Sequence, residues 1–206
     1  PSAMAPPYST MVRSKRGAPP SSAARRRSSR YAYCAAWKVL MAAMELIPAV
    51  HHDPFEIRLR TLLGEVHSRL GEAALAASEF EKALLLVGRA PSVWLEADLR
   101  ERMGRHFLRT GDLGRAAQAL ESGLAIAERA SLLKQVQRAR EGLAEVARRR
   151  NQPEQAVVWL KQAVEALESV RMGAPGPELR AGLMRKNWAV YEELIDLLGE
   201  LHRRRP

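Results

Sequence analysis

The chain has 206 residues, of which 47% are hydrophobic and 5% aromatic, and its formal net charge is +10. A single cysteine, Cys34, excludes an internal disulfide and a metal site built from several cysteines. Residues 1–44 hold eight Lys or Arg and no acid, so the rest of the chain is nearly balanced in charge and lacks the basic surface typical of a nucleic-acid-binding domain.

Residues 1–30 are rich in Pro, Ser, Ala and Arg and offer few side chains that a core could bury. This composition predicts a disordered basic tail or linker. Because the segment is rich in Arg and Ser and free of acids, an organelle-targeting peptide is one alternative. A basic arm that binds nucleic acid through the stretch RRRSSR at 25–30 is another. The folded domain is expected to occupy residues 31–206.

A repeat with a constant interval of forty residues runs through this domain. It aligns LGEVHSRLGEAALAASEF (63–80), MGRHFLRTGDLGRAAQAL (103–120) and LAEVARRRNQPEQAVVWL (143–160). Two slots are small in every copy and a third is larger and apolar. The small slots hold Gly64, Gly104 and Ala144, then Ala76, Ala116 and Ala156; the larger slot holds Phe80, Leu120 and Leu160. Because small side chains let helices approach closely, the pattern predicts helical pairs over 54–90, 93–130 and 132–170 that cross at these slots.

Each pair is expected to turn at a residue that tolerates a positive φ. That slot holds Gly71, Gly111 and Asn151, and Gly and Asn adopt the left-handed backbone conformation most readily. Asp112 and Pro153 follow closely, and both residue types favour the start of a new helix.

The same interval extends to the N-terminal side of the repeats. In each pair, the residues before the turn form the first helix and those after it form the second helix. Forty residues before the slots of the second helix in the first pair lie Ala36, Leu40, Ala43 and Met44. This match predicts a half repeat over 31–50, which is a second helix without its first. If that first helix is absent, the four side chains form an exposed apolar groove. Such a groove marks a partner site or self-association through the open N-terminal face.

A terminal helix is predicted after the break RMGAPGP. The apolar positions of residues 177–203 have helical spacing, and the interval places Leu183 in the slot of Leu143. This helix is expected either to open a fourth repeat or to cap the last exposed face, because helical solenoids need such caps.

These motifs resemble the tetratricopeptide repeat (TPR) family. Leu63-Gly64 followed by Ala76 and Phe80 matches the Leu-Gly and Ala-x3-Phe parts of its pattern. The usual early Trp is absent, and the interval is forty residues rather than about thirty-four, so the chain resembles a long-helix variant. The resemblance implies an all-α fold, an α–α superhelix of antiparallel helix pairs forming a TPR-like solenoid.

No enzyme motif accompanies the repeats. The sequence lacks a Gly-rich phosphate loop, HExxH, G-x-S-x-G and a Cys–His pair with suitable spacing. The one stretch with the composition of a metal site, HHDPFE at 51–56, is expected to be a solvated helix start. We therefore expect no enzymatic activity, no cofactor and no metal. No uncharged apolar run is long enough for a membrane span, and a cytoplasmic location is favoured over an organelle.

By the resemblance, the first helices line a concave groove that binds another protein. The expected binding residues are Arg58, Arg69, Arg105, Arg109, Arg138, Glu141, Arg148, Arg149 and Arg185. Guanidinium groups bind carboxylates bidentately, so an acidic peptide or helix is the expected partner. A balanced, solvated lattice of charges explains the same residues equally well. We expect charge reversal at Arg105 and Arg109 to weaken partner capture and leave folding intact.

The predicted function is thus a non-catalytic protein–protein interaction scaffold or adaptor. The alternative is a regulatory or sensor segment of a larger signalling or transcription-regulating protein. Nucleic-acid binding through the basic tail is the third hypothesis.

Overall fold

The computed structural model describes the backbone of residues 22–47 and 52–204, and within them the chain forms nine α-helices and no strands. The helices are α1 (Ser22–Glu45), α3 (Asp53–Leu70), α4 (Ala73–Arg89), α5 (Val93–Thr110), α6 (Leu113–Arg129), α7 (Leu133–Arg149), α8 (Pro153–Gly173), α9 (Pro177–Lys186) and α10 (Trp188–Arg204). None of these helices combines the length and apolarity needed to cross a bilayer.

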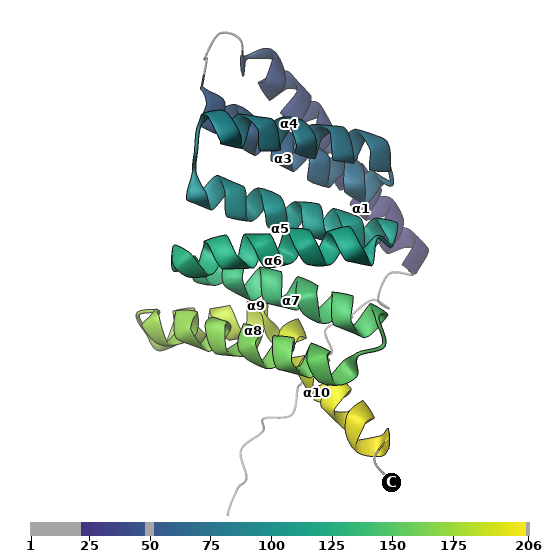
Figure 1. Cartoon of the computed structure of the whole chain (residues 1–206), viewed down its shortest axis with the longest axis vertical. Coiled ribbons are helices and arrows are strands. Elements are labelled where there is room, and N and C mark those ends of the chain that lie inside the picture. The colour runs from purple at the N-terminus through teal and green to yellow at the C-terminus, as the bar shows by residue number, and fades with distance from the viewer. Residues whose placement is uncertain (1–21, 48–51, 205–206) are drawn as a thin grey trace, which may run out of the picture.

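Helices α3 to α8 form three pairs that stack one on the next (Figure 1). Within the pairs, α3 packs on α4, α5 on α6 and α7 on α8. Successive first helices also touch each other, since α3 contacts α5 and α5 contacts α7, whereas the second helices pack mainly on first helices. The stack therefore curves with α3, α5 and α7 on its inner side, and the predicted all-α superhelix is confirmed.

The two helices of each pair meet at the predicted small residues. A Cβ atom added to Gly64 would lie 2.7 Å from the ring of Phe80, and one added to Gly104 would lie 2.5 Å from Cγ of Leu120. In the third pair, Ala144 is completely buried in the same apolar cluster as Leu160. Because protein interiors are close-packed, these small slots set how closely the paired helices approach.

The turns within the pairs have the predicted backbone. Gly71 and Gly111 have φ values of 87° and 84°, and Asn151 has a φ of 57°. Asp112 caps α6, because its carboxylate accepts a hydrogen bond from the amide of Arg115 at 2.9 Å. These local signals are sufficient to end one helix and start the next.

The histidine-rich stretch at 51–56 begins helix α3. Nδ1 of His52 accepts a hydrogen bond from the amide of Phe55 at 3.2 Å, which caps the helix; His51 lies outside the described residues. In the part of the chain that the structure describes, no three His, Cys, Asp or Glu side chains are grouped so that they could hold a metal.

Helix α1 begins earlier than the predicted half repeat. It starts at Ser22, so residues 22–30, predicted to belong to a disordered tail, are helical, and their Ala and Arg are strong helix formers. Residues 1–21 lie outside the described residues. The helix packs on α3. The four predicted groove residues are half-buried rather than exposed: Ala36, Leu40, Ala43 and Met44.

The predicted single helix over 177–203 is instead two helices. Asn187 separates them, and its side-chain amide donates a hydrogen bond to the carbonyl of Leu183 at 2.8 Å, which competes with continuation of α9. Helix α10 packs on α8 more extensively than α9, the helix that holds Leu183, does. It does so through Val190 and Leu197, which are buried in the apolar cluster of the third pair.

Candidate interaction surface

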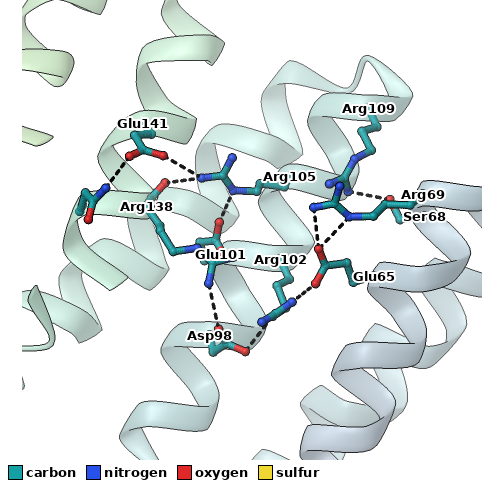
Figure 2. Close-up of polar contacts among 11 residues, drawn as sticks. Glu65, Ser68, Arg69, Asp98, Glu101, Arg102, Arg105, Arg109, Arg138 and Glu141 are labelled. Carbon is teal, nitrogen blue, oxygen red and sulfur yellow. Dashed lines mark hydrogen bonds and ion pairs between the residues drawn. The ribbon is translucent and has the colours of Figure 1, made fainter. Parts of the chain in front are cut away.

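The inner side of the superhelix carries a continuous set of polar contacts between α3, α5 and α7 (Figure 2). We call this set the inner charge network. Figure 2 labels its members Glu65, Ser68, Asp98, Glu101, Arg102, Arg105, Arg138 and Glu141, together with the adjacent Arg69 and Arg109, which are described separately below. Residues three and four positions apart lie on the same helix face, so each first helix presents several of these groups together.

Glu101 lies at the centre of the network and is 1% exposed. One of its carboxylate oxygens pairs with Arg105, one turn further along α5, and the other lies 2.8 Å from Nη2 of Arg138 on α7. Nη2 of Arg105 also lies 3.4 Å from Oε2 of Glu141 and donates a hydrogen bond to the backbone carbonyl of Arg138 at 3.2 Å. This buried carboxylate with two guanidinium partners joins α5 to α7.

A second group of ion pairs joins α3 to α5. Nε of Arg102 donates a hydrogen bond to Oδ2 of Asp98 at 2.7 Å, and its Nη1 pairs with Glu65. Glu65 in turn accepts a hydrogen bond from Nε of Arg69 at 2.9 Å. Arg102 was not among the predicted binding residues, and the only sequence signal for its role was its four-residue spacing from Asp98.

Burial and neighbouring charges also act on the guanidinium groups. Burial lowers the pKa of Arg102 to about 10, and the positive charge of Arg138 adds to this effect. Burial opposes the charge of Arg105 as well, but Glu101 and Glu141 outweigh it and raise the pKa of Arg105. Both groups stay protonated at neutral pH.

Asp98 is a buried carboxyl whose pKa lies well above the ordinary value for Asp. Burial and, after it, the charge of Glu101 raise the pKa of Asp98 to about 6, against the attraction of Arg138, Arg58 and Lys134. The folded state therefore holds this proton more tightly than the unfolded chain does. The resulting stabilisation is complete below the ordinary Asp pKa of about 4 and is lost as the pH rises through about 6.

We expect this linkage to appear as a pH-dependent difference between the wild type and Asp98→Asn. Relative to the variant, the free energy of unfolding of the wild type should fall by about 2 kcal/mol between about pH 4 and pH 7. The comparison cancels the titration of the other acids, and urea unfolding followed by circular dichroism measures it. A difference that stays constant over this range would contradict the assignment.

The nine predicted binding residues fall into different environments. Arg105, Arg138 and Glu141 belong to the inner charge network. Arg58 stacks over the ring of Trp94 at 5.5 Å. Nη1 of Arg148 lies 2.8 Å from a carboxylate oxygen of Glu193 on α10, and Arg185 is exposed on α9. The remaining three, Arg69, Arg109 and Arg149, form a separate group. The side chains of residues 25–30 lie outside the described residues.

Arg69, Arg109 and Arg149 occupy one repeat slot in the last turns of α3, α5 and α7, and all three are exposed. Two of them reach back to the preceding first helix. Nη1 of Arg109 donates a hydrogen bond to Oγ of Ser68 at 3.0 Å, and Nη1 of Arg149 donates one to the carbonyl of Leu108 at 2.6 Å. We call these three side chains the arginine ladder; positive charge at these positions also suits the C-terminal ends of the helices.

The positive charge of the ladder is compensated unevenly. Arg69 and Arg149 each pair with a glutamate four residues earlier, but in α5 that position is Arg105. Among the described residues, Arg109 forms no ion pair with a carboxylate, and burial together with Arg69 and Arg105 lowers its pKa. The excess positive charge is therefore centred on Arg109, and Arg149 lines an adjoining pocket of about 250 Å³ between α7 and α10.

Comparison with known proteins shows a fold and no family. No protein-family model matches the chain, and no curated protein matches it. Among solved structures, the chain is similar to the crystal structure of BtubC (BKLC) from P. vanneervenii. The TM-score is 0.56 and the identity 18%, covering 90% of this chain and 72% of that chain. At this identity the similarity shows the helical fold alone.

Proposed function

We propose that this chain is a non-catalytic interaction scaffold of the TPR type, which binds an acidic peptide or helix along the arginine ladder. The observation that supports the proposal is the recurrence of an exposed arginine at one slot in three successive first helices, on the inner side of the stack. The middle residue, Arg109, forms no ion pair with a carboxylate among the described residues and so has guanidinium donors to offer a partner.

The spacing of the ladder limits the shape of the partner. Contacting helices lie about 8–10 Å apart, so neighbouring guanidinium groups are expected at about that separation. An α-helical partner would match it with acidic residues seven positions apart, about 10 Å along its axis. A peptide in the polyproline II conformation would match it with acids three positions apart, which lie on one face about 9 Å from each other.

The inner charge network has a different role in this proposal. Arg105 and Arg138 already hold the buried Glu101, so they support the surface rather than contact the partner. Their pairing fixes α5 against α7 and thereby fixes the positions of the exposed guanidinium groups at the helix ends. A preorganised surface of this kind loses less entropy on binding.

The double substitution Arg109→Gln, Arg149→Gln tests the proposal. We expect it to weaken binding of a fluorescein-labelled oligoglutamate at least about tenfold, because two charge-assisted contacts are lost. Fluorescence anisotropy at low and high salt measures the effect. The matched control is Arg129→Gln, which removes an exposed arginine from the second helix α6.

The control variant should bind like the wild type, and a labelled oligolysine should not bind. A control that loses about half as much binding free energy as the double variant would show that only net charge matters, because it removes one positive charge instead of two. An oligoglutamate that fails to bind even at low salt would refute the arginine ladder as an acidic-partner site.

A further inference from the structure

Helix α1 has the slots of a second helix but only part of its burial. In α4, α6 and α8, every residue at the slots corresponding to 36, 40 and 43 is buried. In α1, Ala36, Leu40 and Ala43 are only half-buried, because α3 covers one side of the helix and no helix of the described residues covers the other. A second helix in a complete pair is covered on both sides.

The uncovered side of α1 is the side that a first helix covers in a complete pair. Val39 corresponds to Glu79 of α4, which lies 3.0 Å from Nη1 of Arg60 on its own first helix α3. Val39 is 70% exposed, and Leu46, two turns further along, is 63% exposed. The uncovered, apolar Val39 thus occupies the slot that holds the ion-paired Glu79 in the first complete pair.

Helix α10 has the sequence of a first helix. Its residues 197–204 read LLGELHRR, and residues 62–69 of α3 read LLGEVHSR, so six of eight positions are identical. This alignment places Gly199 in the slot of Gly64, where a first helix meets its second helix. It also agrees with the packing, because Leu197 is buried against α8 as expected for a first helix facing the preceding pair.

The side of α10 that would meet a second helix is uncovered in the described residues. Leu198 aligns with Leu63, but Leu198 is 40% exposed whereas Leu63 is 3% exposed. Ile195 aligns with Arg60 and is 62% exposed. Leu198 also lines a pocket of about 370 Å³ between α8 and α10. Within the described residues, α10 is therefore a first helix without its second, and α1 is a second helix without its first.

We infer that α10 of one copy pairs with α1 of a second copy, so that two half pairs form one complete pair across the interface. Gly199 then faces Leu40, as the glycines of α3 and α5 face the large residues of α4 and α6. Ile195 meets Val39 at the slots of Arg60 and Glu79, so an ion pair within the chain corresponds to an apolar contact between copies. This match of slots at the two ends identifies the occupant of each surface as a second copy.

The contact is heterologous, because its two surfaces differ. Each associated copy keeps one free end, so copies add head to tail and continue the stack as an open chain or a ring. The inner sides of successive copies then follow one another along the assembly. The inference does not depend on the acidic partner.

Sedimentation velocity over a range of protein concentrations tests the inference with charged variants at the two ends. Val39→Glu and Ile195→Arg should each weaken self-association at least about tenfold, because a single charge is buried without a partner. The double variant carrying both changes should associate nearly as well as the wild type, because it recreates the Glu–Arg pair of Glu79 and Arg60 between copies. The control, Met41→Glu, lies on α1 at a slot where α4, α6 and α8 have exposed charged residues, and it should behave like the wild type.

Both substituted positions are exposed, so the variants should fold, and thermal melting followed by circular dichroism verifies this. Loss of association in only one of the two single variants would indicate a symmetric contact through one end and would overturn the inference. A double variant no better than the single variants would also overturn it. So would a wild type that stays monomeric up to its highest soluble concentration.

Discussion

Leu120→Ala is expected to lower the free energy of unfolding by about 2–5 kcal/mol, the range for removing a large buried aliphatic side chain. Leu120 is completely buried and packs between two glycines, Gly104 of its own first helix and Gly142 of the next one. Its removal therefore leaves a cavity at a point where three helices meet. Equilibrium urea unfolding followed by circular dichroism measures the loss, and Leu85→Ala on α4, where the side chain is 70% exposed, is the matched control.

The same contact predicts a specific coupling with Gly142→Ala. In the wild type, the new methyl group would lie 2.7 Å from Cδ2 of Leu120, so the single substitution should cost about 1–3 kcal/mol by overpacking. In the Leu120→Ala background the methyl group has space, and alanine is favoured over glycine in a helix by about 1 kcal/mol. Gly142→Ala should therefore become neutral or stabilising there. Additive costs for the two substitutions would show that the side chains do not share this space.

The contacts within each pair, such as that of Leu120 with Gly104, were predictable from the sequence because they depend on side-chain size at a constant interval, whereas the contact of Leu120 with Gly142 of the next pair was not predicted. Gly64 and Gly104 had to be small wherever two helices crossed, and the residues sixteen positions later had to fill the space beside them. The turns were equally local, since Gly111 and Asn151 needed only their own backbone preference. For all three pairs, the sequence therefore predicted the small and large slots at the helix crossing and the position of the turn.

The C-terminal helices were not predicted correctly because the interval changes there. Gly199 follows Ala144 by fifty-five residues instead of forty, so extrapolation by forty selected Leu183 in α9. The extra residues form α9, in which no residue is buried. The match between LLGEVHSR and LLGELHRR was present in the sequence, but it is visible only when the interval is allowed to vary.

The inner charge network could not be predicted for a different reason. The sequence placed Arg105 and Arg109 on the same helix face, but it did not indicate that Arg105 is held between Glu101 and Glu141 while Arg109 stays exposed. That difference depends on how α7 is positioned against α5. The paired charges around Arg105 and the exposed guanidinium groups of the arginine ladder are thus adjacent parts of one surface.

These pairings change the expectation that reversing Arg105 leaves folding intact. Arg105→Glu should lower the free energy of unfolding by about 3–5 kcal/mol, because it removes one partner of the buried Glu101 and adds a like charge beside it. Arg109→Glu, at an exposed residue of the same helix, should cost no more than about 1 kcal/mol. Urea unfolding of the two variants at pH 7 compares them directly. Equal small losses would contradict the central position given to Glu101.

Replacing Glu101, Arg105 and Arg138 jointly by Leu, Met and Met tests whether the inner charge network stabilises the fold or positions the arginine ladder. Removing one member of a buried ionic group leaves an uncompensated charge, whereas replacing the whole group by apolar side chains is commonly neutral or stabilising, by about 1–4 kcal/mol. We therefore expect the triple variant to be at least as stable as the wild type in urea unfolding, although Arg105→Glu alone is not. If the triple variant also binds the oligoglutamate with unchanged affinity, the network supports the fold only. Weaker binding by this stable variant would show that the ion pairs between α5 and α7 hold the arginine ladder in its binding geometry.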